Sequence, residues 1–260
     1  MKKVLFSALA LSAVAASQAV VLYSTGFEAP TFSTGNVGGQ DGWLVDSGST
    51  TRFAVTTANP KSGSQALQAN GGGTDWALPV LNYTPGAGQI VRIKSSIART
   101  VGAAAASSSF GYSIDVYSNL PTFQRTTRFG LIYNAGVIQP FVTSRFAAGV
   151  FNPAAAVVSV LVGGPVAQNA YVDFVADLNY TTKTLDLKVN GISVTGGSTI
   201  PFAGLTSTQM GDADFQISSA AAATDRGYLD NYSVEVVPEP ATMAALGLGL
   251  AAVARRRKSK

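Results

Sequence analysis

The sequence predicts an all-β protein that folds as one antiparallel β-sandwich between two short terminal segments. Short runs of alternating apolar and polar residues recur along the chain, and Gly, Asn, Pro and Ser separate them. No stretch from Val20 to Val236 keeps the 3.6-residue period of an amphipathic helix. Antiparallel strands at this spacing form sandwiches or barrels, and about 215 residues is an acceptable size for one such domain.

The alternation defines the individual strands. In the run 110–117, one face holds Phe110, Tyr112, Ile114 and Val116, and the other holds Gly111, Ser113, Asp115 and Tyr117. We expect about thirteen strands, over residues 43–45, 52–56, 66–69, 76–80, 90–98, 110–117, 128–133, 137–142, 157–162, 171–178, 185–194, 215–218 and 228–237.

Residues 185–194 predict a hairpin. Leu185, Leu187 and Val189 alternate with polar residues, and Asn190-Gly191 follows them. Asn-Gly favours a type I′ turn, because both central positions of that turn need a positive φ.

Composition excludes several classes of function. The chain has no Cys and no His, which excludes disulfides, the usual zinc, haem and iron–sulfur ligands, and Ser–His or Cys–His nucleophiles. Seven of its 18 basic residues lie in the terminal segments, and 13 of its 14 acidic residues lie between them, which gives residues 20–237 a net charge of −2. The basic balance of the whole chain therefore gives no reason to expect a nucleic-acid partner.

The N-terminus predicts a signal peptide over residues 1–19. Lys2 and Lys3 precede an apolar stretch from Val4 to about Ala16, and Ser17-Gln18-Ala19 fits the small-x-small rule for cleavage by signal peptidase after Ala19. The alternative is an uncleaved anchor or a buried helix, but the apolar stretch is too short to span a membrane.

The C-terminus, residues 237–260, predicts a second targeting segment. Ala241–Ala254 is a run of 14 uncharged residues that ends at Arg255, whereas a membrane span needs about 20 apolar residues. We expect a short hydrophobic helix that pauses in the inner membrane, with the basic residues on the cytoplasmic side. Pro238 and Pro240 keep the preceding chain extended, which suits a processing enzyme. The alternative is a simple C-terminal anchor.

This ending resembles the PEP-CTERM sorting signal of Gram-negative bacteria. The residues that carry the resemblance are Val237, Pro238, Glu239, Pro240, Arg255, Arg256, Arg257 and Lys258, with the apolar run between them. The resemblance implies processing near Pro-Glu-Pro by an exosortase, a cysteine protease-transpeptidase of the inner membrane. It also implies transient membrane attachment and then release to the cell surface or matrix, in species that make extracellular polysaccharide and biofilm.

The domain between the two segments, residues 20–236, resembles the concanavalin A-like lectin/glucanase jelly roll, including laminin-G-type modules. The stretches that carry the resemblance are YSTGFEAP (23–30), DGWLVDSG (41–48), YVDFVADLNYTTKTLDLKVNGISV (171–194) and DRGYLDNYSVEVV (225–237). The alternative is an unrelated β-sandwich.

No catalytic motif is recognisable. The resemblance implies closely spaced glutamates on one strand for glucanase activity, but the domain has only Glu28 and Glu235, near its two ends. Asp212 and Asp214 would fall on the same side of an extended strand, although such a pair is more often a solvated turn or a metal site. We therefore predict a non-catalytic protein, with a glycoside hydrolase or lyase of the same fold as the alternative.

The resemblance also suggests a structural calcium ion. Related sugar-binding sandwiches often hold one where the first and last strands meet, and here Glu28 and Asp230 lie near those positions. Calcium prefers carboxylate and carbonyl oxygens, so it needs neither His nor Cys. The alternative is that the two carboxylates make ordinary hydrogen bonds or face water.

Exposed aromatic residues would be needed to bind sugar, because pyranose rings pack on flat apolar side chains. The candidates are Trp43 and Trp76, followed by Tyr83, Tyr117, Tyr133 and Tyr180. Trp43 lies in an apolar strand and could equally be core, whereas Trp76 follows the Gly-rich stretch 70–75. We expect an exported structural or adhesive protein that contacts extracellular polysaccharide; the alternative is a purely structural matrix protein without a sugar site.

Overall fold

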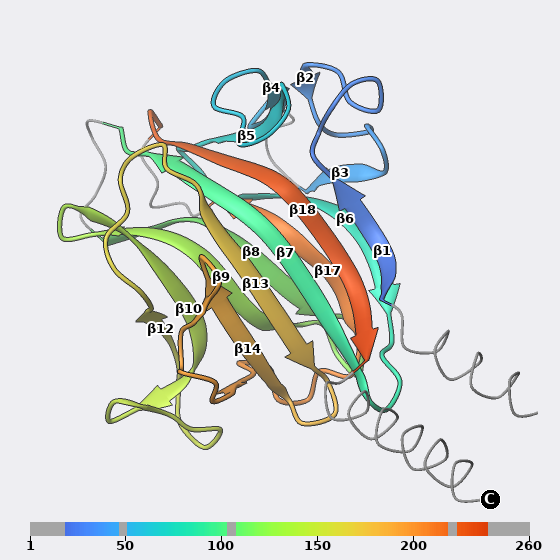
Figure 1. Cartoon of the computed structure of the whole chain (residues 1–260), viewed down its shortest axis with the longest axis vertical. Helices are drawn as coiled ribbons and strands as arrows, with labels where there is room; N and C mark the ends of the chain where they lie inside the picture. The colour runs from blue at the N-terminus through green and yellow to red at the C-terminus, as the bar shows by residue number, and fades with distance from the viewer. Residues whose placement is uncertain (1–18, 47–50, 103–107, 218–222, 239–260) are drawn as a thin grey trace, which may run out of the picture.

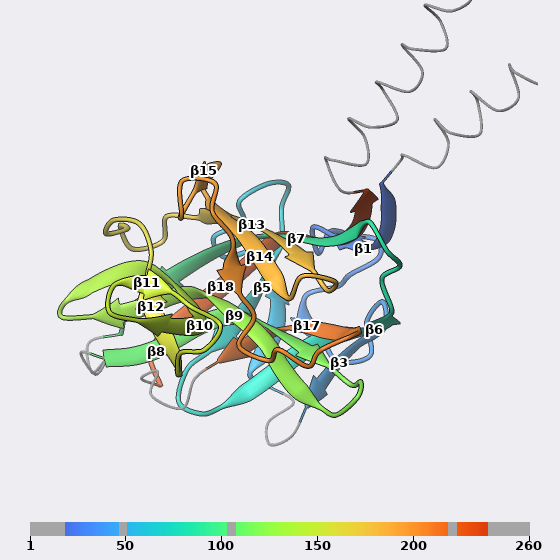
Figure 2. The same ribbon diagram turned by 90° about the horizontal axis from the view of Figure 1, so that it is seen from below.

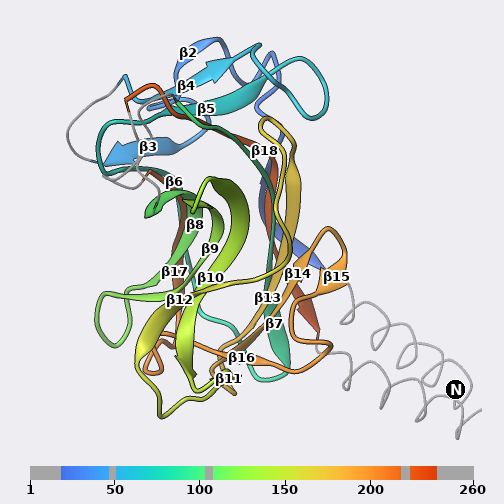
Figure 3. The ribbon, with the colours of Figure 1, turned by 90° about the vertical axis from the view of Figure 1, so that its left-hand side faces the viewer.

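A computed structural model describes residues 19–46, 51–102, 108–217 and 223–238. These residues form eighteen strands and no helix, arranged as two antiparallel sheets that face each other (Figure 1, Figure 3). The predicted all-β antiparallel sandwich is confirmed. The predicted signal peptide and the C-terminal hydrophobic helix lie outside the described residues.

Sheet A has ten strands in the order β15-β14-β13-β7-β18-β5-β4-β2, with β1 beside β18 and β16 beside β14. The bounds are β1 (Val20–Thr25), β2 (Gly35–Asn36), β4 (Phe53–Thr56), β5 (Ala66–Asn70), β7 (Gln89–Thr100), β13 (Val172–Asn179), β14 (Thr184–Val189), β15 (Ile192–Ser193), β16 (Ile200–Pro201) and β18 (Arg226–Pro238).

Sheet B has eight strands in the order β11-β10-β9-β8-β17-β6-β3, with β12 beside β10. The bounds are β3 (Trp43–Asp46), β6 (Asp75–Tyr83), β8 (Ser108–Ser118), β9 (Gln124–Asn134), β10 (Val137–Ala147), β11 (Val150–Phe151), β12 (Val157–Leu161) and β17 (Met210–Ile217).

The core lies between the two sheets and is rich in aromatic rings. Phe174 of β13 meets Phe129 of β9 with ring centroids 5.7 Å apart, and Phe53 of β4 meets Phe215 of β17 at 6.1 Å. These contacts join sheet A to sheet B. The inward residues come from the alternating positions that the sequence predicted, because successive side chains of a strand point to opposite faces.

The predicted hairpin at residues 185–194 is present. Asn190 has a φ of 51° and Gly191 a φ of 80°, so both turn positions lie in the left-handed region that a type I′ turn requires. β14 and β15 pair on either side of this turn.

The two ends of the described chain meet in sheet A. β1 runs antiparallel to β18, with Val20 opposite Val236 (Figure 2). On its other side β18 pairs with β7 as far as Pro238, which lies opposite Gln89. The last strand thus extends two residues beyond the predicted domain boundary at 236, into the sorting segment. Within the part of the chain described, no helix has the length and apolar character needed to cross a membrane.

Truncating a buried aromatic side chain between the two sheets should destabilise the domain. Phe174→Ala removes a buried ring from the contact with Phe129, and we expect a loss of about 3–5 kcal/mol in the free energy of unfolding because a cavity remains. Urea unfolding measures this loss. Ile192→Ala, at a side chain that is 74% exposed, is the control and should change stability by less than about 0.5 kcal/mol. Equal effects of the two substitutions would contradict the assignment of Phe174 to the core.

Candidate functional site

The face of sheet B that points away from the core carries a row of polar side chains, of which Asp115, Thr143 and Asp214 are themselves buried. The strand ladders place Asp214 of β17 opposite Asp115 of β8, Asp115 opposite Arg128 of β9, and Arg128 opposite Thr143 of β10. Residues directly opposite each other in a ladder share a face of the sheet. The row therefore crosses most of the sheet on the side away from the core.

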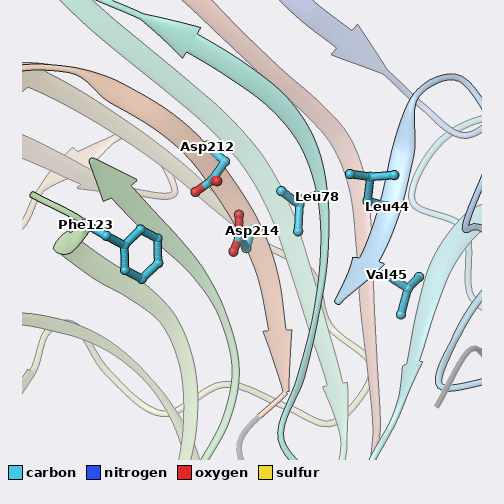
Figure 4. A pocket seen from close by; sticks show the side chains of 6 residues that line it. All are labelled: Leu44, Val45, Leu78, Phe123, Asp212 and Asp214. Atoms are coloured by element: carbon cyan, nitrogen blue, oxygen red, sulfur yellow. The ribbon is translucent and has the colours of Figure 1, made fainter. Parts of the chain in front are cut away.

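A cavity of about 320 Å³ opens at one end of this row (Figure 4). Four apolar and two acidic side chains line it: Leu44, Val45, Leu78, Phe123, Asp212 and Asp214. Figure 4 shows the two carboxylates on β17, between Phe123 on one side and Leu78 on the other. Both aspartates lie in β17, on one side of an extended strand, and not in the solvated turn that is more common for such a pair.

The two aspartates share their environment closely. Burial raises the pKa of the Asp212 carboxyl above its ordinary value, and a hydrogen bond with Asp214 partly opposes that shift. A hydrogen bond between two carboxyl groups needs a proton on one of them. The pair therefore retains a proton at a higher pH than an isolated aspartate would.

The basic residue nearest to the aspartates in the row is already paired. Arg128 donates from Nε and Nη2 to the two oxygens of the buried Asp115, each at 2.6 Å, and it also contacts Gln216. Such a bidentate pair neutralises the guanidinium charge. None of the six residues that line the cavity is basic.

An exposed aromatic pair borders the cavity. Phe123 is 69% exposed, and its ring stacks on Tyr117 with centroids 5.0 Å apart and planes 7° from parallel. Burial raises the pKa of the Tyr117 hydroxyl to about 12, so the phenol stays neutral at physiological pH. Sequence reasoning named Tyr117 as a secondary candidate but missed Phe123, which lies between β8 and β9. The sequence signal that could have identified Phe123 is a large apolar residue within a turn.

The two tryptophans have different positions. Trp76 of β6 is partly exposed and lies opposite Gln216 on the outward face of sheet B. Trp43 is fully buried; its Nε1 donates to the Tyr23 hydroxyl at 2.8 Å and its ring packs edge-on against Tyr232. Trp43 has no surface for a ligand, so the core alternative describes it correctly. Trp76 stays a candidate.

Glu28 and Asp230, the two carboxylates for which a shared calcium ion was predicted, both contact one loop. Glu28 Oε1 accepts hydrogen bonds from the backbone N–H groups of Ser64 (2.9 Å) and Gln65 (3.0 Å). Asp230 Oδ2 accepts from the N–H groups of Lys61 (2.9 Å) and Ser62 (3.1 Å). The two acidic side chains thus hold the same segment, 61–65, against the junction of β1 and β18.

The chemistry of these carboxylates is compatible with calcium, but hydrogen bonds already account for several of their oxygens. The Gln65 N–H lowers the pKa of Glu28, whereas burial raises that of Asp230. Asn231 Oδ1 and Ser62 Oγ lie beside them as further oxygen atoms of the kind that coordinate calcium. Across the described ranges, no group of three or more His, Cys, Asp or Glu residues could hold a metal ion. Calcium at Glu28 and Asp230 stays a prediction.

Comparison with solved structures shows the fold. A protein from Shiga toxin-encoding bacteriophage phi24B, described as the conserved carbohydrate esterase vb_24B_21, has a TM-score of 0.53 and 16% identity. The match covers 85% of this chain and all of that one. A carbohydrate-binding module, CBM66 of Bacillus subtilis, has a TM-score of 0.45 and 13% identity over 75% of this chain and 95% of the module. A sialidase has a TM-score of 0.48 and 9% identity over 74% of this chain, which spans 17% of the sialidase.

Comparison by sequence identifies the C-terminal segment. No curated protein matches the chain. The family model of the PEP-CTERM protein-sorting motif matches residues 236–258, which include every residue predicted for the sorting signal from Val237 to Arg257. The chain therefore combines an antiparallel β-sandwich with a PEP-CTERM sorting motif, and that motif implies an exported protein that an exosortase processes.

Proposed function

We propose that this is a non-catalytic protein of the cell surface or extracellular matrix that binds polysaccharide on the outward face of sheet B. The observation that carries the proposal is the cavity in which exposed Phe123 stands beside the carboxyl groups of Asp212 and Asp214. The C–H faces of a sugar ring pack on aromatic and aliphatic side chains, while its hydroxyls donate to carboxylate oxygens. The fold likeness adds no ligand information, so the proposal depends on the face itself.

The charge of the face favours a neutral polysaccharide over an acidic one. The cavity contributes two carboxyl groups and no basic side chain, and the guanidinium of Arg128 is held by Asp115. The other guanidinium on this face belongs to Arg125, whose Nη1 lies 3.5 Å from Oδ2 of the same Asp115. A uronate or sulfate group placed in the cavity would therefore meet like charge, and no basic side chain lines the cavity itself. Sugar hydroxyls meet no such penalty.

The geometry supports binding rather than glycoside cleavage, the alternative for this fold. Glycosidases hold their two carboxyl groups on opposite sides of the scissile bond, about 5 Å apart or more. Asp212 and Asp214 lie side by side on one face of β17, so they do not flank a glycosidic bond from opposite sides. A purely structural matrix protein is the second alternative, and the binding measurement below distinguishes it.

We also propose that the protein is released from the inner membrane after two cleavages. Mass spectrometry of the protein isolated from the producing cells should give an N-terminus at Val20. The same spectrum should lack the basic cluster Arg255–Arg257, because the exosortase cuts near Pro238. An intact C-terminus on the protein outside the cell would contradict this sequence of events.

Substitutions in the cavity should weaken polysaccharide binding. Phe123→Ala removes the exposed ring, and we expect affinity for the producer's own neutral polysaccharide to fall about tenfold, or roughly 1.4 kcal/mol. Asp212→Asn with Asp214→Asn should weaken binding similarly, because amides accept hydrogen bonds less strongly than carboxylates. Affinity electrophoresis measures both, with Ile192→Ala as the control that should bind normally. No binding by the unmodified protein would favour the structural alternative.

Calcium should raise the thermal stability if Glu28 and Asp230 share an ion. We propose such a structural site at the β1–β18 junction, and a ligand that binds only the folded state stabilises it. The melting midpoint should rise with calcium relative to chelator. Glu28→Gln with Asp230→Asn should abolish the calcium-dependent difference, whatever its effect on baseline stability. An unchanged midpoint in the unmodified protein would contradict the site.

A further inference from the structure

Strand β12 forms an exposed edge of sheet B. Among the described residues it pairs with β10 and with no strand on its other side (Figure 1). Three of its four apolar side chains are exposed: Val157 is 44%, Val158 38% and Leu161 42% exposed. The fourth, Val160, is partly buried against the core.

The ladder with β10 leaves half of the β12 backbone directed outward. Ala156 accepts a hydrogen bond from Phe146 N at 3.2 Å, and Val162 N donates to Pro140 O at 2.9 Å, so the even-numbered residues face β10. Hydrogen bonding alternates along an antiparallel strand. The N–H and C=O groups of the odd-numbered residues 157, 159 and 161 therefore point away from β10, towards the free edge.

This edge lacks the features that normally prevent pairing. Soluble proteins protect edge strands with charged residues, bulges or prolines. From Phe146 to Val172 the sequence has no charged residue, and β12 itself contains no proline. The nearest charge, Arg145, donates to the carbonyls of Ala155 and Ala203.

We propose that β12 is a self-association edge, at which two copies of the chain pair their sheets B in antiparallel fashion. The strand reads Val-Val-Ser-Val-Leu, so a two-fold axis at Ser159 places Val157 opposite Leu161 and Val158 opposite Val160 of the second copy. Every pair is apolar except the central serines. The outward groups of residues 157, 159 and 161 supply about six hydrogen bonds.

A second copy fits this edge better than a charged partner does. A neutral strand offers no charge complementarity to a basic or acidic segment, whereas its own sequence matches it in pattern and length. Five residues extend about 17 Å and bury less than the roughly 1,200 Å² of a stable interface. Association is therefore weak in dilute solution and increases where chains are concentrated, as on a surface or in a matrix.

Cysteine cross-linking tests the register in the exported protein. The natural sequence has no cysteine, so Ser159→Cys can form a disulfide only between chains. Opposed residues in an antiparallel pair have Cα atoms about 5.5 Å apart, which suits a disulfide. We expect Ser159→Cys to give several-fold more disulfide-linked dimer on non-reducing gels than Ile192→Cys, a more exposed control on β15 of sheet A. Equal yields from the two variants would overturn the proposal.

A charge on the edge tests the pairing without a cross-link. Val158 is exposed, so Val158→Lys should keep the melting midpoint, while two lysines near the two-fold axis repel each other. When Val158→Lys is combined with Ser159→Cys, the disulfide-linked dimer should no longer form. In sedimentation equilibrium of chains without cysteine, Val158→Lys should reduce self-association at high concentration, whereas Ile192→Lys should not. Unchanged association of folded Val158→Lys would overturn the proposal even if the cysteine variants failed to fold.

Discussion

Strand β18 lies in the interior of sheet A, and its pairing determines the arrangement of the rest of the molecule. Its first residues pair with β5 and β7, and its last residues pair with β7 and β1. From the middle of this strand, the buried Tyr232 donates its hydroxyl to the carbonyl of Ala213 at 2.9 Å and so reaches sheet B. Ala213 lies between Asp212 and Asp214. One core hydrogen bond therefore fixes the backbone whose outward side chains form the floor of the candidate site.

The position of β18 also connects folding with export. Pro238, the first proline of the sorting motif, is the last residue of the strand and lies opposite Gln89. Val20, the first residue after the predicted signal peptide, lies opposite Val236. The two predicted processing positions thus lie together at one end of sheet A. Each adjoins a strand of the sheet directly, with no linker between. Because β18 occupies an interior position, sheet A cannot be completed until the first residues of the sorting motif have been translocated.

Periodicity was sufficient to predict much of the fold, because a sandwich strand buries every second residue. It also placed Asp212 and Asp214 together, since residues two apart share a face. It could not predict two-residue strands such as β2 and β16, which are too short for any alternation. Periodicity could not decide whether Trp43 is buried or exposed, because an apolar run is compatible with core or surface until its neighbours are known. Phe123 lies outside any strand, so no period applies to it, and its exposure depends on tertiary contacts alone.

The candidate ligand face and the free edge belong to the same ladder of sheet B. The row that begins at Asp214 and passes through Asp115, Arg128 and Thr143 ends at Ser159, whose hydroxyl bonds that of Thr143 at 2.8 Å. Pairing two copies at β12 would continue this row into the second molecule and place both cavities on the same face of the joined sheet. A polysaccharide repeats its own recognition unit, so a second site on the same surface raises the effective concentration of ligand without new contacts. Weak edge pairing and weak sugar binding would then strengthen each other, which suits a protein that acts at high local density.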